Sequence, residues 1–195
     1  MDVVRPRQGL IGGARIERML RTLTGNRTFD QARIPFAAVA TELERGERFV
    51  FQEGPIWEGV RASISIPGIF VPFHTGGHTY VDGGVVDRVP IAAARELGAD
   101  FVIGVDVGYR GGESPCDDLF KIILHSMEIM EWQVMQRRVG EGDFVLAPSL
   151  LEINPASMAQ AETCIRIGRE EMQRRLPELQ EAIEKKKAEL AARQK

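Results

Sequence analysis

Apolar residues recur at helical spacing in several stretches of the chain. In Arg15–Leu23 they fall at positions i, i+3, i+4 and i+7, on one helix face, and Gly25-Asn26 closes the segment. Pro55 can open a further helix, because the N–H that it lacks has no intrahelical partner in a first turn. The pattern predicts helices over Arg15–Leu23, from Pro55, over Pro90–Leu97, over Asp117–Arg138, and from Ala156 to the end with a joint at Pro177.

Shorter apolar runs between these helices have the length of β-strands. The two that flank the charged turn at 44–47 predict a hairpin or a neighbouring pair of strands. A strand, a helix and a strand follow one another from Thr79 to Val107, which predicts a βαβ unit and with it an α/β fold. Strands are predicted over Ile34–Ala40, Arg48–Gln52, Thr79–Val81, Phe101–Val107 and Phe144–Ala147.

Two of these elements are apolar enough to be buried. Phe101–Val107 is nearly all apolar, as in a parallel strand covered on both faces. The helix over Asp117–Arg138 has an apolar stripe broadened by further apolar residues, which predicts a largely buried helix.

Composition narrows the class of protein. The 195 residues are 44% hydrophobic, enough for one domain with a sizeable core. The 25 Lys and Arg against 28 Asp and Glu argue against a protein built to hold nucleic-acid phosphates. Two cysteines make no disulfide framework, and we find no secretory signal or membrane-spanning stretch. We therefore expect a cytoplasmic protein that binds no nucleic acid, and we assign it no cofactor.

Asp82-Gly83-Gly84 is the most informative tripeptide. It follows the predicted strand Thr79–Val81, and α/β sheets place their sites where strands end. The two glycines permit a tight turn and the close approach of a second segment. On its own, the tripeptide more often marks an ordinary Asp-Gly turn.

Evenly spaced His74, His78 and Asp82 raise the alternative of a metal site. On a helix the two histidines would share one face, but Gly76-Gly77 lies between them and Pro72 precedes them, which argues against a helix. We therefore assign no metal ligands.

A serine nucleophile is missing from the sequence. A nucleophile elbow needs small residues two positions before and after its serine, and the neighbours of Ser63 and Ser65 fail this requirement. No Gly-x-Ser-x-Gly occurs in the chain.

Taken together, several segments resemble the bacterial form of the patatin-like phospholipase family. Residues 34–46 resemble the family's strand and turn, and Val60–Phe70 resembles its Ala-Ser-x-x-x-Pro block. Tyr80–Pro90 resembles the segment of the catalytic aspartate, and the helix and strand up to Val107 follow in the same order. The resemblance covers nearly the whole chain and fades after about Arg175.

The resemblance implies a three-layer α/β/α domain that hydrolyses acyl esters with a Ser-Asp dyad and no histidine. The dyad aspartate maps onto Asp82, supported by Gly83 and Gly84, whereas the serine elbow and the oxyanion loop have no counterpart here. We therefore expect residues 1–176 to be the C-terminal part of a patatin-like domain that lacks its N-terminal strand–loop–helix portion. Residues 177–195 would form a charged helical tail.

Three hypotheses follow. In the first, upstream sequence or another chain supplies the serine, and this chain is inactive alone on its lipid or other acyl-ester substrate. In the second, the chain is a non-catalytic remnant that binds lipid or protein. An exposed sheet face would then lead to a partner chain, self-association or peripheral membrane contact. In the third, His74, His78 and Asp82 hold a hydrolytic metal.

Overall fold

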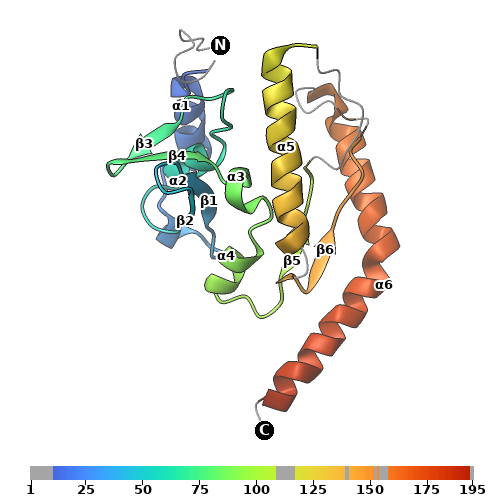
Figure 1. Cartoon of the computed structure of the whole chain (residues 1–195). Helices are drawn as coiled ribbons and strands as arrows, with labels where there is room; N and C mark the ends of the chain where they lie inside the picture. Colours follow the sequence, from blue (N-terminus) through green and yellow to red (C-terminus); the bar gives the residue numbers. More distant parts are fainter. Residues whose placement is uncertain (1–10, 109–116, 139–140, 152, 154–157, 194–195) are drawn as a thin grey trace. The chain divides into compact units, whose positions relative to one another are not determined.

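The computed structural model describes residues 11–108, 117–138, 141–151, 153 and 158–193 (Figure 1). The chain divides into two compact units, Met1–Ala93 and Ala94–Lys195. Both contain helices and strands, so the predicted α/β class is confirmed. None of the helices in the described ranges combines the length and the apolar composition that spanning a bilayer requires.

The first unit contains a four-stranded antiparallel sheet in the order β2-β1-β4-β3. Strands β1 (Ala38–Glu42) and β2 (Glu47–Phe51) form the predicted hairpin, and β3 (Phe73–Thr75) and β4 (His78–Asp82) form a second one. Strand β1 pairs on both sides and is buried along its whole length. It is therefore the centre of this unit, and its neighbour β4 carries Asp82.

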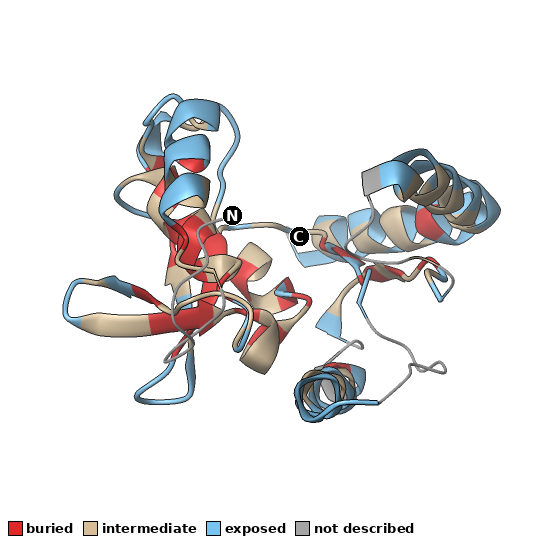
Figure 2. Ribbon diagram, turned by 90° about the horizontal axis from the view of Figure 1, so that it is seen from above, coloured by how far each residue is buried: buried red, intermediate tan, exposed pale blue. Residues whose placement is uncertain are grey.

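Helices α1 (Ala14–Leu23) and α2 (Ile56–Ser63) form where the sequence predicts them. Figure 2 shows the buried residues of this unit gathered on the sheet and the helix beside it. Gly59 lets α2 pack closely against the end of β2, because a Cβ at Gly59 would lie 2.8 Å from the Cβ of Phe51. The core consists of Leu20, Phe29, Ala38, Ala40, Phe51, Trp57, Ala62, Phe73 and Tyr80. Three short helical segments complete this part of the chain: η1 (Phe29–Gln31), α3 (Gly84–Asp87) and α4 (Ile91–Glu96).

The second unit has a smaller sheet, in which β5 (Ile103–Val105) pairs in parallel with β6 (Phe144–Leu146). Its helices are α5 (Leu119–Arg138), the short η3 (Met158–Gln160) and the long α6 (Ala161–Arg193). Phe144, Leu146 and Leu179 form a core cluster in which α6 packs on β6.

The predicted βαβ unit over Thr79–Val107 is wrong. Strand β4 belongs to the antiparallel sheet of the first unit, and β5 belongs to the parallel pair of the second. The sequence pattern identifies β5 correctly as a parallel strand, but its partner is β6. The prediction paired strands that are neighbours along the chain. It failed because the residues of an apolar strand do not specify which other strand it pairs with.

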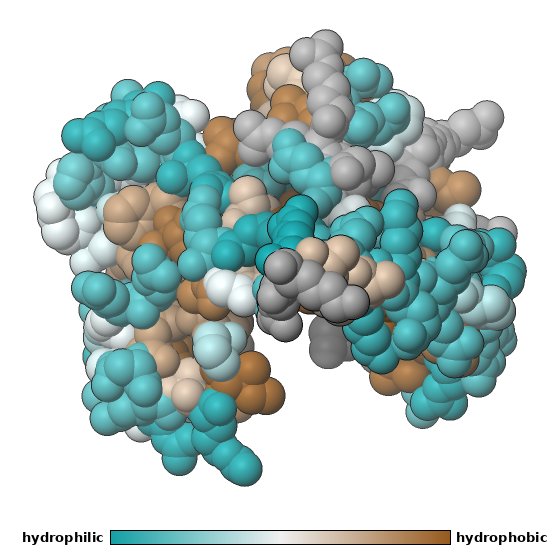
Figure 3. Space-filling model, turned by 90° about the horizontal axis from the view of Figure 1, so that it is seen from below, coloured by the Kyte–Doolittle hydropathy of each residue, from teal (hydrophilic) through white to brown (hydrophobic). Residues whose placement is uncertain are grey.

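The predicted burial of α5 and β5 is also wrong. Met135 is buried, but seven apolar side chains of α5 are 39–73 % exposed. In β5, Ile103 and Val105 are exposed on one face while Gly104 between them is buried. Figure 3 likewise shows apolar residues at the surface, between hydrophilic ones. Two strands of three residues give ~10 Å of sheet, too little to cover a helix of 20 residues that is ~30 Å long.

The predicted joint at Pro177 is not a break, because α6 continues through it. Beyond the proline, Leu179 is buried in the core cluster and Lys186 Nζ lies 3.0 Å from Asp143 Oδ1. The domain boundary at 176/177 stays a prediction, but the first part of the expected tail packs on the second unit.

Candidate functional site around Asp82

Asp82 is the last residue of β4, and its main chain is held on both sides. Its N–H donates to the carbonyl oxygen of Ser65 at 3.0 Å. Its carbonyl oxygen accepts the hydroxyl of Thr41 at 2.9 Å, and it lies opposite Ala40 in the β1–β4 ladder. The position of the residue is therefore fixed by the centre of the sheet and by the segment after α2.

The Asp82 carboxyl group turns back on the chain that follows it. Its Oδ1 accepts the N–H of Gly84 at 2.7 Å. Burial raises the pKa of Asp82 above its ordinary value of 3.8, and the hydrogen bond from Gly84 offsets only part of that rise. A carboxylate that binds a proton more readily is a better general base near neutral pH.

Gly83 is required by close packing. A Cβ at this position would overlap the carbonyl oxygen of Val39 on β1 and lie 2.9 Å from its carbonyl carbon. Its φ of −65° is open to any residue, so space and not conformation demands the glycine. The Asp-Gly-Gly motif therefore brings the chain directly onto the central strand, with Asp82 at the contact.

Ser65 is part of the framework of the site and is inaccessible to a substrate. It is 0 % exposed, and its hydroxyl accepts Arg61 Nη1 at 2.6 Å and donates to the Arg61 carbonyl oxygen at 2.8 Å. The exclusion of Ser65 as a nucleophile, made on its flanking residues, is thus supported by its burial. Ser63, at the end of α2, is half-buried.

The structure does not bring His74, His78 and Asp82 together. His74 is exposed on β3, and His78 Nδ1 lies 2.9 Å from the buried Glu42 carboxylate. Among the residues that the structure describes, no group of three metal-binding side chains forms a site.

Sequence reasoning missed Thr41, whose hydroxyl donates to the Asp82 carbonyl oxygen, and Arg61, which donates to the hydroxyl of Ser65. The signal for Arg61 was its place one turn after Trp57, on the apolar face of α2, where a charged residue is unexpected. Thr41 gave no comparable signal, because threonine is common in strands.

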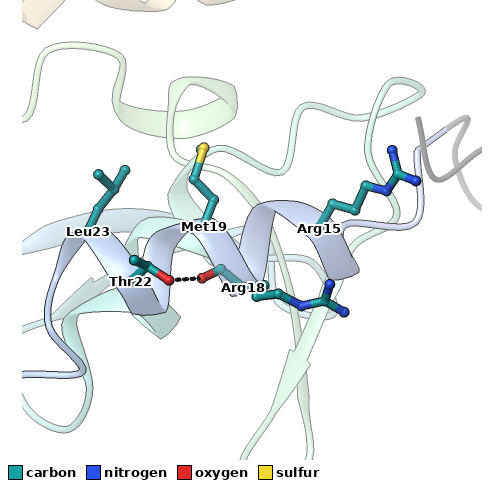
Figure 4. Close-up of a pocket in the computed structure, with 5 residues that line it drawn as sticks. All are labelled: Arg15, Arg18, Met19, Thr22 and Leu23. Atoms are coloured by element: carbon teal, nitrogen blue, oxygen red, sulfur yellow. Dashed lines mark hydrogen bonds between the residues drawn. The ribbon is translucent and has the colours of Figure 1, made fainter.

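A shallow surface pocket lies elsewhere, along α1. Its lining includes Arg15, Arg18, Met19, Thr22 and Leu23, and Figure 4 shows Met19 and Leu23 on the same side of the helix. The Thr22 hydroxyl donates to the Arg18 carbonyl oxygen at 3.0 Å, so it is engaged with its own helix. This pocket contains none of the motif residues.

Comparisons with known proteins match part of the sequence to a family. A family model described as patatin-like phospholipase matches residues 2–95, which include Thr41, Arg61, Ser65 and Asp82. An uncharacterised NTE family protein of Mycobacterium tuberculosis is 36% identical over 99 residues, covering 51% of this chain and 28% of the relative.

Two mammalian proteins are also similar. The human patatin-like phospholipase domain-containing protein 6 is 25% identical over 169 residues, covering 85% of this chain and 12% of the relative. Protein 7 of the same series, from Rattus norvegicus, is 30% identical over 112 residues, covering 56% and 8%. The chain therefore spans less than a third of the length of these relatives.

Proposed function

Because residues 2–95 belong to the patatin-like phospholipase family, we propose that Asp82 is the catalytic aspartate of a lipid acyl hydrolase whose nucleophilic serine lies outside these 195 residues. The observation that carries this proposal is the Asp82 carboxyl group itself. It ends a central strand, is oriented by the Gly84 N–H at 2.7 Å, and has a raised pKa. Gly83 and Gly84 support it, as the resemblance implies.

The reaction divides into two transfers in which Asp82 carries the proton. The serine oxygen attacks the ester carbonyl carbon, its proton passes to the Asp82 carboxylate, and the leaving alcohol takes that proton as the C–O bond breaks. Water then attacks the acyl-serine carbonyl, gives its proton to Asp82, and the serine oxygen leaves with it. Oxyanion donors must come from the same missing portion as the serine.

The proposal is tested by joining the chain to the polypeptide that the DNA upstream of Met1 encodes. We expect that product to hydrolyse a p-nitrophenyl ester, and Asp82→Asn to lower its kcat by ~10²-fold or more. Asp30→Asn is the matched control, because Asp30 is an exposed aspartate of the same unit. The absence of both a glycine loop and Gly-x-Ser-x-Gly from the upstream polypeptide would contradict the proposal.

A second candidate function, binding of lipid or protein without catalysis, is favoured by the apolar face of β5. Ile103, Val105 and the adjacent Val107 are 47–60 % exposed, and such faces favour association or peripheral contact with a membrane. A monodisperse monomer by sedimentation that fails to float with phospholipid vesicles would exclude this candidate. Ester hydrolysis by the joined product would instead favour the first.

The limits of the patatin-like region and the tail also remain proposals. We propose that the C-terminal part of a patatin-like domain occupies residues 1–176, with a charged helical segment over 177–195, in a cytoplasmic protein. Limited proteolysis tests the limit: a stable product ending near residue 176 supports it, whereas uniform protection of α6 contradicts it.

A further inference from the structure

Arg61 is an arginine in the apolar interior of the first unit. It is 1 % exposed, with the buried Trp57 one turn earlier on α2 and Phe73 at 5.7 Å from ring centroid to guanidinium carbon. Burial lowers the pKa of Arg61, although Glu17 opposes that effect. Removing a guanidinium from water costs free energy, which its hydrogen bonds and charged contacts must offset.

The guanidinium connects three segments of the first unit. Nη1 donates to the Ser65 hydroxyl at 2.6 Å, and Nη2 donates to the carbonyl oxygen of Val71 at 3.0 Å. Nε lies 3.4 Å from the Glu17 carboxylate on α1. One side chain thus joins α1, the end of α2 and the segment that leads into β3.

Space for this side chain is reserved by Gly13, the residue before α1. A Cβ on Gly13 would overlap Arg61 Nη2 and lie 2.7 Å from Nε. The φ of Gly13, 85°, is also one that favours glycine. The guanidinium therefore lies directly against the backbone of Gly13, where any larger residue would displace it.

Ser65 transmits this restraint to the candidate catalytic residue. Its hydroxyl bonds both the side chain and the carbonyl oxygen of Arg61, which fixes the turn at the end of α2. The carbonyl oxygen of that same fixed residue accepts the Asp82 N–H at 3.0 Å. Two hydrogen bonds in series therefore connect the buried cation to Asp82.

We propose that Arg61 is a positioning residue, which holds Asp82 at the end of β4 by fixing Ser65 with its guanidinium. The catalytic purpose of this restraint rests on the proposed function of Asp82, but the restraint itself is a property of the isolated chain. The alternative is a cation that stabilises the whole unit and has no particular effect on Asp82.

Amide hydrogen exchange of the isolated chain separates these possibilities. The exchange rate of the Asp82 N–H measures the restraint by Ser65. The exchange rate of the Leu43 N–H, which donates to the Thr79 carbonyl oxygen at 2.9 Å, measures the stability of the β1–β4 pair at its other end. Arg61→Lys keeps the positive charge but loses the planar guanidinium with its several N–H donors. Ser65→Ala removes only the hydroxyl. Arg21→Lys is the control, because Arg21 stacks on Trp57 at 3.6 Å.

We expect Arg61→Lys and Ser65→Ala each to reduce the protection of the Asp82 amide ~10-fold relative to that of Leu43. Arg21→Lys should change both amides by the same factor. An unchanged ratio of the two protections in Ser65→Ala would overturn the proposal, and this variant decides the matter even if Arg61→Lys fails to fold. Because no serine, substrate or turnover is involved, this result is independent of whether Asp82 proves to be catalytic.

Discussion

Gly83 and Val39 touch so closely that no side chain fits between them: a Cβ on Gly83 would lie 2.9 Å from the Val39 carbonyl carbon. Gly83→Ala must therefore shift α3 or β1, and we expect a loss of ~1–3 kcal/mol in the free energy of unfolding. Urea denaturation measures it. Gly168→Ala, in α6 with open space around its Cβ position, is the control and should be neutral or slightly stabilising. Equal effects of the two substitutions would contradict this account of the Asp-Gly-Gly motif.

The raised pKa of Asp82 predicts a pH-dependent stability. A group whose pKa is raised in the folded state stabilises fully below its ordinary value, here 3.8, and loses that stabilisation as the pH rises through the folded pKa. At neutral pH the ionised Asp82 therefore costs stability, since burial opposes its charge. Asp82→Asn should raise the urea midpoint at pH 7 relative to the unsubstituted chain, and the gain should shrink toward pH 3. A midpoint lowered equally at both pH values would refute this.

In the second unit, the Asp143 carboxylate binds several polar groups at once. Its carboxylate accepts the Val102 N–H at 2.8 Å, contacts Arg95, and lies 3.0 Å from Lys186 Nζ. Burial alone would raise the pKa of Asp143, but these hydrogen bonds outweigh it and lower the pKa below 3.8.

Asp143→Asn should therefore destabilise the chain by ~1–3 kcal/mol at pH 7. A depressed pKa gives stability that is present above 3.8 and lost as the pH falls through the folded value, so the difference should diminish in acid. Circular dichroism during urea unfolding measures both. Glu184→Gln removes an exposed pair with Lys187 and should change stability by less than ~0.5 kcal/mol. The interpretation fails if the two variants behave alike.

The exposed face of β5 predicts association. Val105 is 50 % exposed, and replacing it with lysine should shift any dimer seen by sedimentation toward monomer without reducing stability. Ile165→Lys, at an apolar site on α6 that is 61 % exposed, should leave the association unchanged. Loss of dimer with both substitutions would point to general solubility and away from this face.

The spacing of residues along the chain predicted where single helices and hairpins form, whereas strand pairing and the course of α6 depend on packing. The helical spacing in Arg15–Leu23 placed α1 to within one residue, and the charged turn at 44–47 placed the β1–β2 hairpin. Strand pairing was not predictable in the same way, because the residues of β4 and β5 do not specify a partner strand, and the two strands lie in different sheets. Pro177 did not end α6, since Leu179 beyond it gains burial against β6.

At the candidate site, the motif identified Asp82 but not what holds it. Asp82, Gly83 and Gly84 were found from the order of residues alone. Arg61 acts through the nearby Ser65, whose carbonyl oxygen accepts the N–H of Asp82, a residue distant in sequence. Thr41 reaches the carbonyl oxygen of Asp82 at 2.9 Å, and this contact depends on the pairing of β1 with β4, which the sequence pattern did not specify.

We propose that this chain supplies the aspartate of an acyl hydrolase and not its serine. Intact-mass spectrometry after treatment with a fluorophosphonate tests it most directly, because the reagent adds covalently to an activated serine. The 195-residue chain alone should gain no adduct, whereas the chain joined to its upstream polypeptide should gain one, on a serine outside these residues. A stoichiometric adduct on the 195-residue chain alone would contradict the claim.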